Sequence, residues 1–220
     1  MLFYFSATGN CLHVARNLDD NPLSIAQELK KDERVYQDET MGLVSPIYGG
    51  ELPTIVRDFI ATSTFQTDYF YVVLTYGNLD TAAAEWTYYF AKSHRVNIDY
   101  IGTIKMVDNY LPAFDMNEQM AMDKHEDEQI RQVKANILAR VALIPHPDEK
   151  ARKLYDMASR RPVEVNNGSQ ITVRTERCVG CGICTKVCPV GNFYIKDGSE
   201  PLPGNVRVLP GLGTSLSAKG

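Results

Sequence analysis

The sequence has no long apolar run, no excess of basic residues, and only one cysteine outside a short C-terminal stretch. Without a run of about 20 apolar residues, no segment is expected to span a membrane. The first ten residues, MLFYFSATGN, lack both a basic region and a long apolar core, so no signal peptide is expected. The formal net charge of −4 argues against a nucleic-acid partner bound through its phosphates.

The composition is that of an ordinary globular protein: of 220 residues, 44% are hydrophobic and 23% are charged. A chain of this size can form one medium-sized domain with a small appendage. We expect a cytoplasmic protein, and in that reducing compartment clustered cysteines indicate metal or redox chemistry rather than disulfides. The mildly acidic net charge suits basic redox-protein partners.

Short segments rich in β-branched and aromatic residues alternate with helical patterns along the chain. This alternation predicts βαβ crossovers and a doubly wound parallel sheet, which is the α/β class. Strands, several of them running into loops, are expected within Leu2–Phe5, Pro22–Ala26, Met41–Gly50, Asp68–Asn78 and Asn97–Val107.

The helix boundaries are also predicted from local signals. Pro53 is expected in the first turn of one helix, and Asp80 or Thr81 as the cap of another that ends near Ser93. A long helix is expected over Asn117–Leu143, with DKHEDEQ (residues 123–129) as a solvated face, followed by a short helix and a linker.

The stretch SATGN, from Ser6 to Asn10, follows the first predicted strand and opens the first helix. Backbone N–H groups at a helix N-terminus, together with the helix dipole, favour an anion. Ser6 and Thr8 add hydroxyls, Asn10 adds an amide, and Gly9 lets the backbone approach a ligand. Since the turn has no Lys or Arg, a phosphate there would be bound by neutral dipoles. The alternative is an ordinary turn with Asn10 as the helix cap.

Cys11 follows this turn. A helix N-terminus lowers a thiol pKa, so Cys11 is a candidate reactive thiol; the alternative is a small packed residue.

Two later strands end in SPIYGG (residues 45–50) and TYGN (residues 75–78). In open α/β sheets, ligands bind at the carboxyl ends of the strands, at the switch in strand order. A planar aromatic ligand would stack on Tyr48 or Tyr76, and backbone groups of the neighbouring glycines would reach its polar edge. Core packing is the alternative for one tyrosine. The candidate ligand-binding residues in these two loops are Pro46, Tyr48, Gly49, Gly50, Thr75, Tyr76, Gly77 and Asn78.

The stretch RCVGCGICTKVCPVGN contains Cys178, Cys181, Cys184 and Cys188. The spacing C-x2-C-x2-C-x3-C-P is that of a bacterial iron–sulfur ligand run. Zinc also takes four thiolates, but zinc sites usually present two separated C-x2-C pairs. The run therefore favours an iron–sulfur cluster over zinc.

The turn SATGNC resembles the phosphate-binding turn of the flavodoxin family, [ST]-x-T-G-x-[ST], except that Cys11 replaces the last hydroxyl. The stretch VDNYLPAF (residues 107–114) resembles a segment of flavodoxin–ferredoxin fusion proteins from anaerobic bacteria. The resemblance implies a flavodoxin-like five-stranded sheet of order 2-1-3-4-5, with FMN phosphate held by residues from Ser6 to Cys11. It implies a flavodoxin-like domain over residues 1–160, a linker over 161–170, and a truncated ferredoxin-like segment with a 4Fe–4S cluster over 171–220.

In two-cluster ferredoxins the fourth cysteine of such a run ligates the other cluster, so Cys188 and the first three cysteines await partners from a second run. The tail NVRVLPGLGTSLSAKG has no cysteine. Its Val206, Leu209, Leu212 and Leu216 repeat the 3, 3, 4 spacing of the cysteines. Read one nucleotide later, the codons allow cysteine at three of these four positions, but not at 212.

We therefore entertain a frameshift in this tail, with coincidence as the alternative. Sequencing the gene through this region distinguishes them, because coincidence predicts no cysteine codons in the shifted frame.

Together these features predict an electron-transfer flavoprotein that passes electrons between FMN and a 4Fe–4S cluster or an external redox protein. Two alternatives remain: a flavin-dependent reductase of a small molecule, and an FMN-binding protein whose C-terminal segment binds no cluster.

Overall fold

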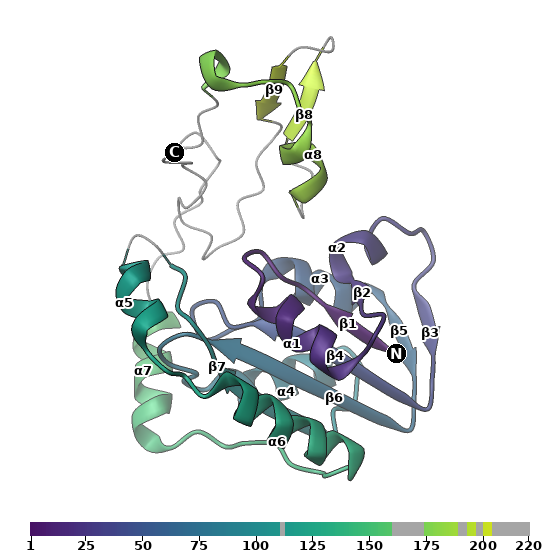
Figure 1. Cartoon of the computed structure of the whole chain (residues 1–220). Coiled ribbons are helices and arrows are strands. Elements are labelled where there is room, and N and C mark those ends of the chain that lie inside the picture. Colours follow the sequence, from purple (N-terminus) through teal and green to yellow (C-terminus); the bar gives the residue numbers. More distant parts are fainter. Residues whose placement is uncertain (111–112, 160–173, 189–192, 197–199, 204–220) are drawn as a thin grey trace. The chain divides into compact units, whose positions relative to one another are not determined.

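The structure is a computed structural model that describes residues 1–110, 113–159, 174–188, 193–196 and 200–203. The chain divides into two compact units (Figure 1). The first comprises Met1–Asn109 and Phe114–Pro162, and the second comprises Tyr110–Ala113 and Val163–Gly220.

A five-stranded parallel sheet forms the centre of the first unit. Its strands lie in the order β2-β1-β4-β6-β7, which is 2-1-3-4-5 when the sheet strands are numbered along the chain. The predicted α/β class and flavodoxin-like strand order are therefore confirmed. The strands are β1 (Leu2–Tyr4), β2 (Leu23–Ser24), β4 (Thr40–Pro46), β6 (Tyr69–Tyr76) and β7 (Tyr100–Lys105).

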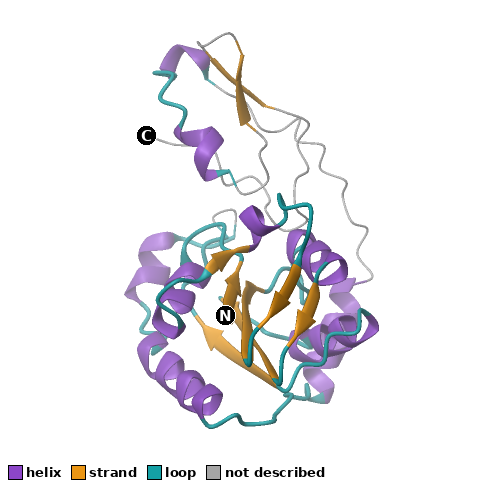
Figure 2. Ribbon diagram, turned by 90° about the vertical axis from the view of Figure 1, so that its right-hand side faces the viewer, coloured by secondary structure: helices purple, strands orange, loops and turns teal. Residues whose placement is uncertain are grey.

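Helices cover both faces of this sheet, as Figure 2 shows. In Figure 1, α1 and α6 lie in front of the sheet and α3 and α4 behind it. The helices of this unit are α1 (Asn10–Leu18), α2 (Ile25–Glu28), α3 (Thr54–Thr62), α4 (Ala83–Ser93), α5 (Met116–Ala121), α6 (Glu126–Leu138) and α7 (Glu149–Ser159).

Each face of the sheet has its own core. On one face, Val14 of α1 and Ile130 of α6 pack with Val73 and other buried strand residues. On the opposite face Phe3 packs edge-on or tilted against Phe59 and Phe65, with ring centroids 5.1 and 5.9 Å apart. Burying such rings provides much of the driving force for packing helices on a sheet.

A second, two-stranded parallel sheet pairs β3 (Val35–Gln37) with β5 (Thr64–Gln66). This pair was not predicted, because VYQ and TFQ are short and contain polar residues, so neither forms an apolar run. The buried ring of Tyr36 stacks on Phe65, and its hydroxyl donates a 2.8 Å hydrogen bond to the buried carboxylate of Glu28.

Three helix starts differ from prediction by one or two residues. Gly9 rather than Asn10 is the N-cap of α1, Pro53 is the N-cap of α3 rather than a first-turn residue, and Ala82 precedes α4. The side chain of Asn10 is engaged elsewhere, which leaves the capping position to Gly9.

The single long helix predicted over Asn117–Leu143 is wrong. The backbone is extended at Met122 and left-handed at His125, with φ of +54°, so α5 and α6 are separate. Asp123 accepts a 2.8 Å hydrogen bond from the backbone N–H of His125, and this local bond stabilises the break. After α6, Leu143 forms a bridge with Tyr100 beside β7 instead of continuing a helix.

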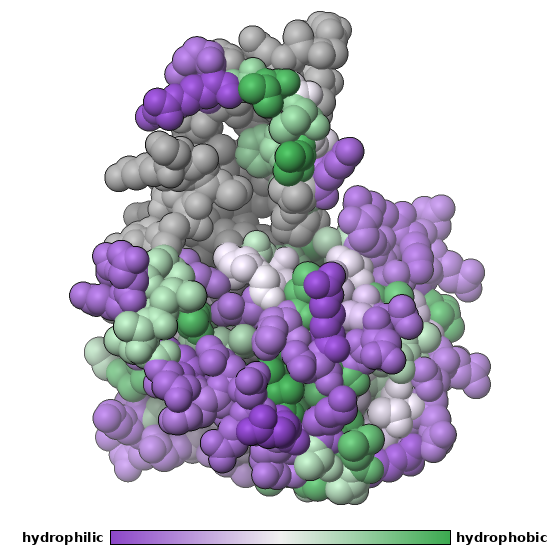
Figure 3. Space-filling view, in the orientation of Figure 1, coloured by the Kyte–Doolittle hydropathy of each residue, from purple (hydrophilic) through white to green (hydrophobic). Residues whose placement is uncertain are grey.

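Most of the stretch DKHEDEQ is solvated, as predicted: the side chains of Asp123 and His125 are 74% and 69% exposed. Its last residue, Gln129, is instead partly buried and accepts a 2.8 Å hydrogen bond from the backbone N–H of Lys105. Hydrophilic residues cover most of the α/β unit's visible face in Figure 3. In the part of the chain that the structure describes, no helix has the length and apolar character needed to cross a membrane.

The residues of the second unit that the structure describes form short elements. They are the 3₁₀ turn η1 (Thr175–Arg177), α8 (Ile183–Val187), and the antiparallel strands β8 (Phe193–Lys196) and β9 (Glu200–Pro203). The predicted linker over residues 161–170 lies outside the described residues. So does the tail that contains Val206, Leu209, Leu212 and Leu216.

Candidate functional site

The loops that follow β1, β4, β6 and β7 meet at the carboxyl edge of the sheet. The backbone N–H of Ile47, after β4, donates to the carbonyl of Thr75 on β6 (2.9 Å). The backbone N–H of Met106, after β7, donates to the carbonyl of Tyr76 (2.8 Å). The predicted loops are therefore neighbours, because parallel strands end at the same edge.

The first loop, which connects β1 to α1, is joined to the loop after β7 by two asparagine side chains. Asn10 donates from Nδ2 to the carbonyl of Val107 (2.9 Å), and Asn109 donates from Nδ2 to Oγ1 of Thr8 (2.5 Å). Sequence reasoning missed Asn109. Its position just after the fifth strand was the available signal, since that strand ends at the same edge.

Both hydroxyls of the first loop act as acceptors within the protein. Ser6 Oγ accepts from the backbone N–H of Gly9 (3.1 Å), and Thr8 Oγ1 accepts from Asn109. A hydroxyl that accepts one hydrogen bond still has its own proton to donate. Ser6 and Thr8 are thus prepared to donate to an anion.

Gly9 gives this loop its shape. Its φ is +109°, in a region that side-chain-bearing residues rarely adopt, and a Cβ built on it would have no heavy atom within 4 Å. As N-cap it provides no side-chain acceptor for the first turn of α1. The first-turn N–H groups of a helix have no intrahelical partner, so those of α1 remain available to a ligand.

Cys11 does not extend the ligand-binding turn with its side chain. The thiol is 1% exposed, lies in the core, and shares a 3.1 Å hydrogen bond with the buried hydroxyl of Thr75. Burial raises the pKa of the Cys11 thiol to about 12. The packed residue was the correct interpretation and the reactive thiol was not. The side chain of Thr75 is likewise in the core, so only the backbones of these two residues remain as candidates for a ligand.

We therefore expect Cys11 to resist thiol reagents. In cluster-free native protein at pH 8, a disulfide reagent should titrate four thiols, and the fifth only after denaturation. At pH 10 the result should be the same, because the thiol stays protonated until the pH rises through its folded-state pKa of about 12. A Cys11→Ala variant is the control, with four thiols in both states; five fast thiols in the native wild type would contradict the burial of Cys11.

The loop after β4 makes a tight turn from Tyr48 to Glu51. The backbone N–H of Tyr48 donates to the carbonyl of Glu51 (2.9 Å), and the N–H of Glu51 donates to the carbonyl of Tyr48 (3.2 Å). Gly49 and Gly50 have φ of +63° and +89°, as a type I′ turn requires. This conformation explains why two glycines stand together.

The predicted glycines differ in what lies beside them. Gly49 faces open space, whereas a Cβ on Gly50 would lie 2.8 Å from the ring of Tyr155 and a Cβ on Gly77 would lie 2.4 Å from the side chain of Asp108. A side chain at Gly49 would thus meet no neighbour, whereas protein side chains occupy the space where a Cβ of Gly50 or Gly77 would lie.

Tyr48 and Tyr76 are both half-buried at this edge, and Pro46 and Asn78 lie in the same two loops. Burial raises the pKa of both tyrosine hydroxyls, so both are neutral at physiological pH. A role of either ring against a planar ligand stays a prediction.

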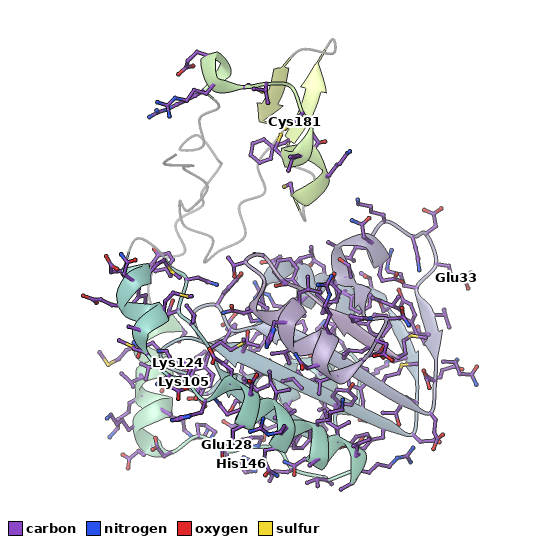
Figure 4. The ribbon with its side chains drawn as sticks, viewed as in Figure 1. Glu33, Lys105, Lys124, Glu128, His146 and Cys181 are labelled. Atoms are coloured by element: carbon purple, nitrogen blue, oxygen red, sulfur yellow. The ribbon has the colours of Figure 1, made fainter. Side chains whose placement is uncertain are left out.

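The four C-terminal cysteines lie around α8 (Figure 4 labels Cys181). Cys181 is exposed, and the other three are partly exposed. Gly180 and Gly182 have positive φ, and the backbone N–H of Gly180 donates to Sγ of Cys178 (3.4 Å). Among the residues that the structure describes, no three His, Cys, Asp or Glu side chains are gathered as a metal ion would require.

A comparison with known families finds one match in this part of the chain. The 4Fe–4S binding domain family matches residues 171–194, which include all four cysteines. This match supports an iron–sulfur cluster rather than zinc. A search of curated proteins found no match.

Among solved structures, rubredoxin oxygen:oxidoreductase from the anaerobe Desulfovibrio gigas has 11% identity and a TM-score of 0.36. That match covers 63% of this chain but only 36% of the other protein. The Trp repressor binding protein from Bacillus subtilis has 8% identity and a TM-score of 0.39, over 62% of this chain and 96% of its own. Because these scores are low, the fold assignment rests on the strand order described above.

Proposed function

We propose that this protein is an electron carrier that holds FMN at the carboxyl edge of its sheet and a 4Fe–4S cluster on its C-terminal cysteines. We propose redox proteins as its partners. The observation that carries the FMN assignment is the first turn of α1, where backbone amides adjoin the hydroxyls of Ser6 and Thr8, which donate to no other residue in the part of the chain that the structure describes.

The phosphate of FMN fits this turn chemically. Backbone N–H groups at a helix start bind phosphate without a basic side chain. The phosphate would be held by Ser6, Thr8 and the first-turn amides after Gly9. The side chains of Asn10 and Asn109 would fix this loop through their hydrogen bonds to Val107 and Thr8. The thiol in place of the last hydroxyl removes one donor, because Cys11 points into the core.

For the flavin ring, we propose the space bounded by the loops after β4 and β6. Tyr48 and Tyr76 are the rings available for stacking, and Gly49 is the position at which the backbone is uncovered. When bound, a flavin exchanges two electrons and passes them singly to a cluster or a protein partner.

For the cluster, the four thiols are of the right chemical type, but their side chains are not gathered in the part of the chain that the structure describes, and the tail has no cysteine to act as the partner expected from a second run. Cys178, Cys181 and Cys184 are the proposed ligands, with Cys188 as the fourth residue of the run. Metal binding is often coupled to local folding, so these thiols would close around the cluster as it assembles. Gly180 and Gly182 provide the left-handed backbone that such a wrap needs.

Anaerobic reconstitution with FMN, iron and sulfide tests the proposal. The expected spectrum has flavin bands and a broad iron–sulfur shoulder, and metal analysis should find iron with sulfide. In a Cys181→Ser variant the shoulder should disappear and the flavin bands should remain. Zinc in place of iron, or no bound flavin, would contradict the respective half of the proposal; NAD(P)H turnover without a protein acceptor would favour a self-contained reductase.

A further inference from the structure

Helix α7 packs against the turn that we assign to the flavin. The ring of Tyr155, in α7, lies directly beside Gly50: a Cβ on Gly50 would stand 2.8 Å from its Cδ2 and 3.2 Å from its Cε2. Helix α7 lies outside the alternation of strands and helices that builds the sheet. Its contact with this turn therefore needs a separate explanation.

The hydroxyl of Tyr155 is also fixed to the turn. It donates a 3.0 Å hydrogen bond to Oε1 of Glu51, the last residue of the turn. The other oxygen of Glu51 accepts from the Arg57 guanidinium (3.1 Å), which also donates to Thr54 Oγ1 (3.0 Å) at the start of α3. Burial and the Glu51 carboxylate raise the pKa of Tyr155 to about 12, so the hydroxyl keeps the proton it donates.

A third element reaches the same point. Oγ1 of Thr81, in the loop after β6, would lie 3.0 Å from a Cβ on Gly50. Thr81 has φ of +49°, an uncommon conformation for a β-branched residue, and its buried hydroxyl has no partner among the described residues. Gly50 thus lies between Tyr155 and Thr81, at the point where α7 meets the loops after β4 and β6.

Helix α7 is itself held against α4. The Arg152 guanidinium forms an ion pair with Glu85 of α4, with N···O distances of 2.7 and 2.8 Å. Glu85 is only 13% exposed, and its pKa is lowered by this hydrogen bond. Tyr155 therefore contacts the turn from a helix that is itself fixed to α4 by an ion pair.

We propose that Tyr155 is a positioning residue that fixes the Tyr48–Glu51 turn for the flavin, through its ring on Gly50 and its hydroxyl on Glu51. This inference rests on the proposed FMN site. A turn that adopts its binding conformation only part of the time weakens apparent affinity by that fraction. Without Tyr155, the two glycines would allow the turn many other conformations, because glycine restricts the backbone least.

The test uses Tyr155→Phe, which keeps the ring and removes the hydrogen bond to Glu51, and Tyr155→Ala, which removes both. The matched control is Tyr89→Phe, which removes a hydroxyl from the 58% exposed tyrosine of α4. Three quantities are measured on the full chain: amide hydrogen exchange of peptides containing residues 48–51, the FMN dissociation constant, and the midpoint potential of bound FMN.

We expect faster exchange in the turn without FMN, an FMN dissociation constant raised about fivefold in Tyr155→Phe and more than about tenfold in Tyr155→Ala, and a shifted potential. Tyr89→Phe should match the wild type. Adding Tyr155→Phe to Glu51→Ala should weaken binding little beyond Glu51→Ala alone, since that variant already lacks the acceptor of the Tyr155 hydroxyl as well as the Arg57 ion pair.

The hydrogen-exchange readout decides the inference independently of the cofactor. Unchanged exchange in Tyr155→Ala overturns the positioning role, whether or not FMN binds. If the Tyr155 variants show faster exchange in the turn but bind FMN with unchanged affinity and potential, the proposal that Tyr155 fixes the turn for the flavin is also overturned. A wild type that binds no FMN, but shows the exchange difference, refutes the proposed function while the fixation of the turn by Tyr155 stands.

Discussion

Replacing Gly9 by alanine is expected to raise the FMN dissociation constant at least about tenfold. Gly9 has φ of +109° and ψ of −28°, and no neighbouring atom would collide with an added methyl group. The effect is therefore conformational: residues forced into such regions cost on the order of 1–3 kcal/mol, and the loop would relax to avoid this. Relaxation moves the hydroxyls and first-turn amides that we assign to the phosphate, and 1.4 kcal/mol corresponds to a tenfold loss.

The measurement is a fluorescence titration of FMN into cofactor-free protein. Ala61→Gly is the control, because it also changes one methyl group at an exposed position, but in α3 and outside the loop assigned to the phosphate. It should leave the dissociation constant within about twofold, as surface changes away from special features have small effects. Equal affinity for wild type and Gly9→Ala would mean that the phosphate does not bind at this loop.

Replacing Gly42 by alanine is expected to lower the free energy of unfolding by about 3 kcal/mol or more. Gly42 lies in β4, in register with Tyr71 of β6, and a Cβ there would stand 2.1 Å from Cζ of the buried Tyr71 ring. Neither the paired backbone nor the buried ring can move away easily. Overpacking of this kind typically costs 1–3 kcal/mol, and this contact is at the severe end.

Urea unfolding followed by circular dichroism measures this loss, with Gly102→Ala as the control. A Cβ on Gly102 would first meet the hydroxyl oxygen of Tyr100 at 2.9 Å, which is a much smaller overlap than the 2.1 Å approach at Gly42. The loss for Gly102→Ala should therefore be clearly smaller. If Gly42→Ala does not fold, shortening the ring with Tyr71→Val should restore folding; equal losses at both glycines would contradict the packing described here.

The sheet was predictable from the sequence because β4, β6 and β7 are apolar segments of six to eight residues that are separated by helical patterns. The loops at the carboxyl edge followed from that order, since strands running in parallel end together. The direction of individual side chains was not predictable. Cys11 occupies a motif position that suggests contact with a ligand. In the structure it lies in the first turn of α1, and its thiol is directed to Thr75 in the core.

Contacts between distant segments were also beyond the reach of sequence patterns. Nothing near Tyr155 marks it as the partner of Gly50 and Glu51, about a hundred positions earlier in the chain. The break between α5 and α6 depends on a local hydrogen bond at Asp123 that competes with helix formation. The cysteine run, by contrast, needed no structure, because its chemistry is encoded in spacing alone.

The central claim is that one chain holds a flavin and an iron–sulfur cluster that exchange electrons. The direct test loads the protein with both under anaerobic conditions, reduces the flavin with a short light pulse in the presence of a sacrificial electron donor, and follows the cluster absorbance. We predict bleaching of the cluster as the flavin is reoxidised, and its absence in Cys181→Ser with flavin binding retained. A flavin that is reduced and reoxidised while the loaded cluster stays unchanged would contradict the account.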